Sequence, residues 1–368
     1  MKVLSLTMTL AFFLVWGGVT APEVYAKEAA RPQLSLQEAI DLALKNSNSV
    51  DKASKDVERT EELRDDAGYN LYKFVPEGHN GTAAVESAYS SALSTDLTWQ
   101  VSRRSYTSAQ DAQVMDATKK YWAILDGQEK VKNAQLSVKT ALMQLQNANA
   151  ARRVGMSFSA NLSPDQAVAS AEYQYAGAQA TLTSNQNDLD KAYEAFNQLV
   201  ALWPEDRPVL TDTIVFKPLE VSDLNHEVSR VLETAPSIWK AEQEANMKAI
   251  LKNVASYTGG YVNAEAKEIE VEQAELDVSS AKKLLEQTTR TLYYGIKSQE
   301  ESYASAEQQV KVCEENLRVK KLQFELGMVT ALELASEEKN LADARFKVFD
   351  IVCTHAGLKL SFQTPWAG

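Results

Sequence analysis

Cysteine is nearly absent from this chain, which holds only Cys313 and Cys353 among 368 residues. If the helices around them form an antiparallel hairpin that turns near Gly327, the two thiols lie at heights that differ by about 10–20 Å. A disulfide needs Cα atoms within about 7 Å of each other. We therefore expect two free, buried thiols and a fold that obtains its stability from packing.

Histidine is equally scarce, and His79, His226 and His355 show no metal-ligand spacing. The sequence also lacks a Gly-x-Ser-x-Gly turn, a phosphate-binding loop and a Cys-x-x-Cys pair. These absences predict a protein that is not an enzyme and that uses no cofactor and no metal.

Positive charge is in deficit, because 38 Lys and Arg stand against 50 Asp and Glu, for a formal net charge of −12. A chain this acidic is repelled by phosphate backbones and by anionic lipid headgroups. We expect no nucleic-acid partner and no docking on anionic lipid.

Long apolar runs are missing after the N-terminus. There, Leu4–Val19 is mostly apolar, Lys2 precedes it, and Val24 and Ala26 supply the small residues of a cleavage site. A membrane anchor is the alternative, but the run is shorter than the roughly 20 residues of a spanning helix. Residues 1–26 are thus predicted to be a signal peptide, and the mature chain is expected in the cell envelope.

An internal repeat is the most informative pattern that is present. Leu36–Val50 matches Leu224–Ile238 at a constant offset of 188 positions, and the register persists to Tyr69 and Tyr257. Further on, Val154–Met156 corresponds to Leu326–Met328. One supersecondary unit must therefore account for both halves.

Each half contains a long helical pattern with apolar residues in steps of seven, typical of a coiled coil. The first series is Ala117, Ile124, Val131, Val138 and Leu145, flanked by Ala134, Ala141 and Ala148. It predicts a helix over 108–153, about 70 Å long. An ordinary amphipathic bundle helix is the alternative, but such helices usually run about 8–20 residues.

The second series shifts phase once. It comprises Val271, Val278, Leu285, Leu292, then Ile296 after four residues, and then Tyr303, Val310, Leu317 and Phe324. A four-residue insertion is a stutter, which locally unwinds a left-handed supercoil. The pattern predicts a rod over 264–326, about 95 Å long.

Capping signals divide the rest of the chain. Ser163 with Gln166 and Thr330 with Glu333 are capping boxes, which predict returning helices over 165–202 and 331–362. Leading helices are expected over 36–67 and 224–257, from Ser35 and Ser222, with a restart at Pro236. The expected fold is all-α, with a first repeat at 27–203, a proline-containing linker at 204–222 and a second repeat at 223–368.

At this point the chain resembles the TolC-like outer-membrane efflux family. The likeness rests on three segments in the right order: Leu34–Ser47, the proline-containing Leu232–Ile238, and a Gly-Met turn followed by an acid- or amide-Leu pair in each half. The resemblance implies a homotrimer whose helix hairpins form a hollow tube, with β-hairpins that build a shared twelve-stranded outer-membrane barrel. It also implies work with a periplasmic adaptor and an inner-membrane pump.

The chain departs from that family where the strands should be. Between residues 68 and 107, only Leu97, Trp99 and Val101 alternate cleanly with polar residues. A membrane strand needs about 9–11 alternating residues. Residues 257–263 leave no room for a second hairpin, so we expect β-hairpin segments that are short or absent, and membrane insertion is in doubt.

The hairpin tips are the candidate site. Gly155 and Gly327 suit backbone turns, and a flexible methionine thioether suits a partner surface. The candidate adaptor-contact residues are Gly155, Met156, Gly327, Met328, Glu333 and Glu337. For the acidic residues, a solvated helix face is the simpler alternative.

The leading functional hypothesis is a component of an envelope efflux or secretion conduit. A non-pore exported coiled-coil protein with a structural or interaction role is the alternative, and a surface coiled-coil spacer is a third hypothesis.

Overall fold

The computed structural model describes residues 32–73, 81–156, 162–258 and 264–367. The expected signal peptide and His79 lie outside these ranges. The described chain is built of helices, and its strands are only β1 (Gln33–Leu34) and β2 (Val209–Leu210). The helices are α1 (Leu36–Lys45), α2 (Asn48–Lys73), α3 (Gly81–Arg153), α4 (Pro164–Val200), α5 (Leu224–Thr234), α6 (Pro236–Thr258), α7 (Ala264–Glu325) and α8 (Ala331–Gln363).

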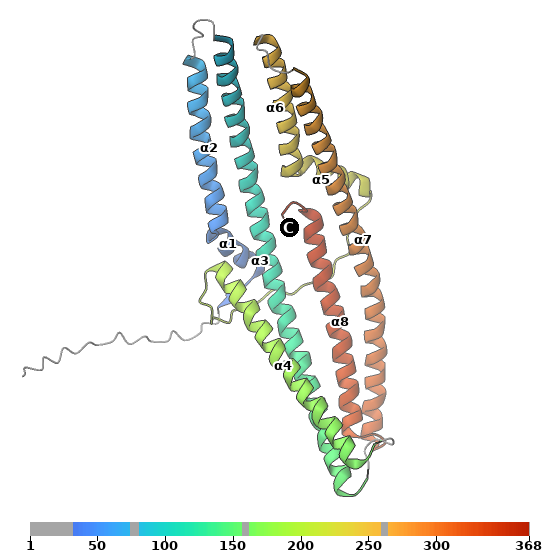
Figure 1. Ribbon diagram of the computed structural model, residues 1–368. Coiled ribbons are helices and arrows are strands. Elements are labelled where there is room, and N and C mark those ends of the chain that lie inside the picture. The colour runs from blue at the N-terminus through green and yellow to red at the C-terminus, as the bar shows by residue number, and fades with distance from the viewer. Residues whose placement is uncertain (1–31, 74–80, 157–161, 259–263, 368) are drawn as a thin grey trace, which may run out of the picture.

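These helices form an elongated bundle of near-parallel rods (Figure 1). Helix α3 packs against both α2 and α4, and α7 packs against both α6 and α8. Contacts of α3 with α6 and α8 join the two halves. The end of α3 and the start of α4 lie at the same end of the molecule as the turn from α7 to α8, and the ends of α2 and α6 lie at the other (Figure 1). The all-α fold is confirmed, while the exact domain boundaries stay a prediction.

Helix starts follow the capping chemistry of the sequence. Ser35 with Glu38, Ser163 with Gln166, and Thr330 with Glu333 all form complete capping boxes. The expected cap at Ser222 is wrong, because the side chain of Asp223 accepts the hydrogen bond from the Asn225 amide instead.

The alternating residues Leu97–Val101 lie inside α3, in agreement with the expectation that β-hairpin segments are short or absent. That helix begins at Gly81 rather than near Ser108 and runs for 73 residues, about 110 Å. Tertiary contacts explain the difference. A buried hydrogen bond of 2.7 Å joins the Thr60 and Ser102 hydroxyls, so α2 pairs with α3 along this stretch.

The first leading helix is interrupted, whereas a continuous helix over 36–67 was expected. Helix α1 ends with Asn46 as its C-cap, and α2 restarts at Asn48. The Ser47 hydroxyl accepts from the Val50 amide at 3.4 Å, as a capping side chain does. Its counterpart in the second half restarts at Pro236, as predicted.

The largest core surrounds the strand pair. Tyr121 and Phe196 are fully buried and meet edge to face with centroids 6.1 Å apart. The strands β1 and β2 pair in parallel, with Gln33 opposite Val209. The linker at 204–222 thus returns to the start of the first half and fastens it, which the sequence did not reveal.

The seven-residue series are largely borne out as packing positions. In α3, Ala117, Ile124 and the flanking alanines are buried, and the remaining members are half-buried. In α7, Ile296 is fully buried directly after the stutter, and Leu317 is buried against α8. Phe324 is an exception, because it is exposed in the last turn of α7.

Both thiols are free, as expected. Cys313 is buried between α7 and α8, and Cys353 is half-buried. Burial raises the pKa of Cys353 to about 12, which keeps it a neutral thiol.

Candidate functional site

The first hairpin tip is built from the C-terminus of α3. The Met156 amide donates to the Ala151 carbonyl at 2.9 Å, and the Gly155 amide donates to the Arg152 carbonyl at 3.0 Å. This pair of bonds is a Schellman motif, which satisfies carbonyls that the helix end leaves unpaired. Gly155 takes φ +70°, a left-handed conformation that glycine adopts without the strain of a Cβ, and this agrees with the turn predicted here.

The second tip repeats this geometry at the end of α7. The Met328 amide donates to the Gln323 carbonyl at 2.8 Å, and the Gly327 amide donates to the Phe324 carbonyl at 2.9 Å. Gly327 takes φ +69°. The second connection is shorter and leads directly into Thr330, the N-cap of α8. Both tips therefore present the same backbone shape to solvent.

Large apolar side chains are exposed at both tips. Met156 is 65% exposed and Met328 is 70% exposed. Their neighbours Val154 and Leu326 are 71% and 74% exposed. The two turns lie at the same end of the rod (Figure 1). Exposed apolar groups gathered at one end of the molecule are typical of a surface that receives a partner.

The two acidic candidates differ in what their carboxylates do. Glu333 accepts from the Thr330 amide at 2.7 Å and from the Thr330 hydroxyl at 3.0 Å, and the backbone bond holds its pKa below the ordinary value. It therefore serves α8 as a capping residue and remains charged. Glu337, one turn further, is half-buried and accepts from the Asn340 amide group at 3.2 Å. Neither side chain reaches across to the first tip through any hydrogen bond or ion pair described for these residues.

The described histidines are not brought together. His226 is exposed at the start of α5, and His355 is buried in α8, 3.5 Å from the Glu300 carboxylate. Within the described ranges, no group of three His, Cys, Asp or Glu side chains could hold a metal ion. No helix in this part of the chain combines the length and the apolar character needed to cross a bilayer.

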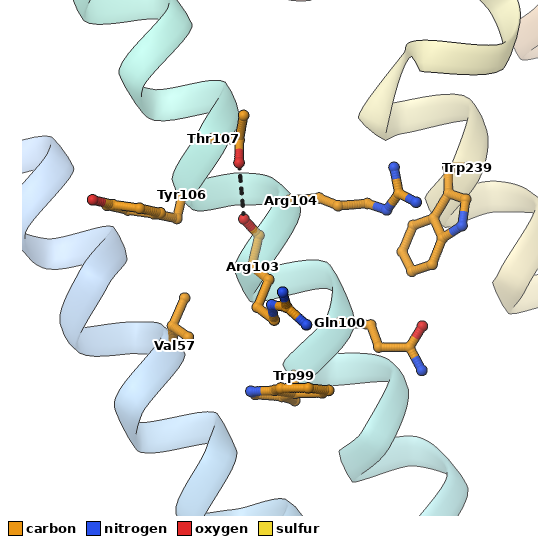
Figure 2. A pocket seen from close by; sticks show the side chains of 8 residues that line it. All are labelled: Val57, Trp99, Gln100, Arg103, Arg104, Tyr106, Thr107 and Trp239. Carbon is orange, nitrogen blue, oxygen red and sulfur yellow. Dashed lines mark hydrogen bonds between the residues drawn. The ribbon is translucent and has the colours of Figure 1, made fainter.

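Sequence reasoning missed one clustered feature away from the tips. Arginine and tryptophan side chains line a hollow of about 600 Å³ where α3 meets α6, with Val57 of α2 at its other side (Figure 2). Arg103 and Arg104 were visible in the sequence as a basic pair, but Trp239 comes from the other half of the chain. Only the packing of α3 against α6 reveals the cluster.

Comparison with family models finds no match to this chain. No curated protein matches it either.

Solved structures do match over nearly the whole chain. The Campylobacter jejuni CmeC outer-membrane channel is similar with a TM-score of 0.66 and 12% identity, covering 99% of this chain and 94% of that one. CusC, described as forming a transmembrane channel, is similar with a TM-score of 0.63 and 13% identity, covering 92% of this chain and 94% of that one. The Neisseria gonorrhoeae MtrE outer-membrane channel is similar with a TM-score of 0.61 and 16% identity, covering 90% of this chain and 89% of that one. The resemblance read from the sequence is therefore confirmed at the level of fold: this chain has the fold of TolC-like outer-membrane channels.

Proposed function

We propose that this chain is a protomer of an α-helical tube in an envelope efflux or secretion conduit, and that its hairpin tips contact a periplasmic adaptor that joins it to an inner-membrane pump. The observation that carries the proposal is the pair of matching, exposed Gly-Met tips at one end of the rod. The shared fold of the outer-membrane channels CmeC and MtrE supports it. In this role the chain is not an enzyme.

The physical argument starts from the exposed tip methionines. Flexible, polarisable Met side chains adapt to an irregular partner surface and gain apolar burial there. The rigid Schellman turns beneath them fix the backbone, so little ordering entropy is lost on binding. The charged Glu333 and Glu337 at the second tip add an electrostatic component that salt screens.

Assembly into a homotrimer is part of this proposal. A single chain supplies four long hairpin helices in the described residues, and they pack side by side in the order α4, α3, α8, α7 as an open layer. Large apolar side chains are also exposed along the outer helices, for example Tyr173 on α4 and Leu284 on α7. Light scattering on the processed chain at micromolar concentration should give three times the chain mass, and a monomer throughout would contradict the tube.

The test of the tips is site-specific photo-crosslinking in the native envelope. A crosslinker at position 156 or 328 should capture an adaptor-class periplasmic protein, identified by mass spectrometry. A crosslinker at Leu276 is the matched control, because this α7 residue is 66% exposed but distant in sequence from either tip. Capture of the same adaptor from all three positions, or from none, would contradict the tip assignment.

Charge and shape can be separated at the second tip. Glu333→Gln keeps the capping acceptor and removes the charge. Glu337→Gln removes a charge one turn later, where the side chain has no capping role. Both should weaken adaptor capture more at low salt than at high salt. If capture is unchanged at both ionic strengths, the two carboxylates are plain structural groups.

A non-pore envelope protein with an interaction role is the second candidate. It is favoured by the helical ends opposite the tips, where α2 continues to Lys73, α3 starts at Gly81 and α6 continues to Thr258. Planar-bilayer recordings separate the two: stable channels formed by the purified chain would support the conduit, and silence together with absent adaptor capture would support the alternative.

A further inference from the structure

Two neighbouring hollows lie along the seam between α3 and α6, called the α3–α6 seam from here on. The larger has a volume of about 600 Å³ and is lined by Trp99, Arg103, Arg104 and Trp239, among others. The smaller, about 200 Å³, shares Arg104 and Trp239 and adds Lys240. The stacked Arg104 and Trp239 thus form a wall common to both.

The arginines of the seam are stacked rather than paired with acids. The Arg104 guanidinium lies 4.0 Å from the centroid of the Trp239 ring, and that of Arg103 lies 4.9 Å from the Trp99 ring. Figure 2 shows Arg104 extended from α3 toward Trp239 on α6, with Arg103 above Trp99. Among the described residues, neither arginine forms an ion pair with a carboxylate. Arg64, which also lies on Trp99, differs because it pairs with Asp65 at 2.7 Å.

The lining of both hollows is rich in donors and free of carboxylates. The Gln100 amide nitrogen donates one of its two N–H groups to Asp96 at 2.6 Å. By contrast, the buried Trp99 indole nitrogen has no acceptor in the part of the chain that the structure describes. The smaller hollow also contains Pro236 and Ser237, the first residues of α6, where a helix carries partial positive charge. In a chain of net charge −12, this is a local site of the opposite sign.

The second half of the chain provides an internal comparison. The repeat offsets place Val57 on Ala245, and they place Arg103 on Glu275. Ala245 and Glu275 line a hollow of about 340 Å³ between α6 and α7. The residue that corresponds to Arg103 is thus acidic, and no tryptophan lines this hollow. The α6–α7 pair is the counterpart of α2–α3, so packing on the α2 side of the larger hollow does not require Arg103.

We propose that the α3–α6 seam binds a small planar organic anion, an aromatic carboxylate. Its carboxylate lies between the Arg104 guanidinium, Lys240 and the first turn of α6, where charge-assisted hydrogen bonds are strong. Its flat body lies in the larger hollow against Arg103 and the neighbouring rings, since a guanidinium stacks on aromatic faces. The larger hollow falls within the range of about 300–1,000 Å³ that small-molecule sites occupy. This inference rests on the seam alone and is independent of the conduit.

Isothermal titration calorimetry on the processed full chain tests the assignment. The probe is 2-naphthoate, and its uncharged amide, inorganic phosphate and phosphatidylglycerol vesicles are the comparison ligands. We expect saturable naphthoate binding at one site per chain, with the amide and inorganic phosphate at least about tenfold weaker, because one charged hydrogen bond is worth about that factor or more. The vesicles should not bind, in keeping with the acidic surface.

Substitutions in the seam test where the ligand binds. Arg103→Gln with Arg104→Gln should weaken naphthoate binding by about tenfold to a hundredfold, because both guanidinium contacts are lost. Trp239→Phe should weaken it less, and it guards against a folding artefact, as does an unchanged circular dichroism spectrum. Glu275→Gln, at the equivalent position of the second half, is the matched control and should leave the affinity unchanged.

Four results would overturn the proposal. Equal affinity for naphthoate and its amide would show that the site does not recognise the negative charge. Phosphate affinity equal to that of naphthoate would show that the site does not recognise the aromatic ring. Binding of anionic vesicles without naphthoate binding would make the ligand a lipid headgroup. An arginine double variant with wild-type affinity would leave the seam as a structural stack only.

Discussion

Tyr121 offers the sharpest test of how the linker holds the first half of the chain. Its ring is fully buried, its hydroxyl donates to the Leu34 carbonyl at 3.1 Å, and it accepts from the Asp212 amide at 3.0 Å. The Leu34 carbonyl has a second donor, the Thr211 amide at 3.1 Å, but the Asp212 amide depends on the tyrosine. Burial raises the pKa of Tyr121, so the hydroxyl stays protonated and able to donate.

Tyr121→Phe keeps the ring and removes only these two bonds. Each net hydrogen bond is worth about 1 kcal/mol, so we expect the free energy of unfolding to fall by about 2 kcal/mol. The matched control is Tyr303→Phe, because the Tyr303 hydroxyl donates to Glu307 on the same exposed helix face at 2.7 Å. Such a surface change should cost less than about 0.5 kcal/mol.

Urea unfolding followed by circular dichroism measures both variants under identical conditions. Amide hydrogen exchange adds a local measurement, since the amides of Thr211 and Asp212 should exchange faster in Tyr121→Phe and not in the control. A loss below about 0.5 kcal/mol, equal to that of the control, would refute the reasoning and leave the strand ladder as the sole fastening.

Other outcomes follow from single contacts. Gly327→Val should destabilise the second tip by about 1–2 kcal/mol, because a Cβ is strained at φ +69° although nothing lies within 4 Å of it; an unchanged melting temperature would contradict this. A Cβ on Gly127 would lie 3.0 Å from Leu189 Cδ1, whereas Gly177 has open space, so Gly177→Ala should stabilise the chain by about 1 kcal/mol in thermal melts and Gly127→Ala by less. Cys353 should react with iodoacetamide far more slowly than a free cysteine at pH 8, since burial raises its pKa to about 12. Burial lowers the pKa of His355 below 6.5, so the unfolded state binds a proton at this side chain more readily than the folded state does. The free energy of unfolding should therefore decrease as the pH falls below about 6.5. His355→Phe should flatten that part of the pH profile.

Local chemistry made part of this fold predictable from the sequence. The capping boxes and the glycine turns depend on residues within five positions of one another, and the structure places them as expected. The start of α6 at Pro236 was also predictable from local sequence, because proline suits the first turn of a helix. The run Asn46–Ser49 carried a comparable signal for the break between α1 and α2, because such residues favour caps over helix interiors.

Non-local packing decided the features that the sequence did not reveal. Leu97 and Val101 alternate like strand residues over only five positions, but they are also spaced as neighbours on one helix face. Contact with α2 selects the helix. The β1–β2 pair consists of two residues on each side, too short for any periodicity, and its partners are separated by most of the first half. Arg104 and Trp239 likewise meet only after the two halves pack together.

The two halves differ least at the tips and most at the opposite end. Both tips keep a Schellman turn with Gly and Met at equivalent positions. Yet α3 has 73 residues and α7 has 62, and the basic Arg103 of the first half corresponds to the acidic Glu275 of the second. Stability alone does not demand exposed methionines, since a polar residue would serve the position after the turn glycine equally well. The proposed adaptor, meeting both tips at once, accounts for the shared geometry, whereas the α3–α6 seam occurs once in the chain because it joins α3 of the first half to α6 of the second.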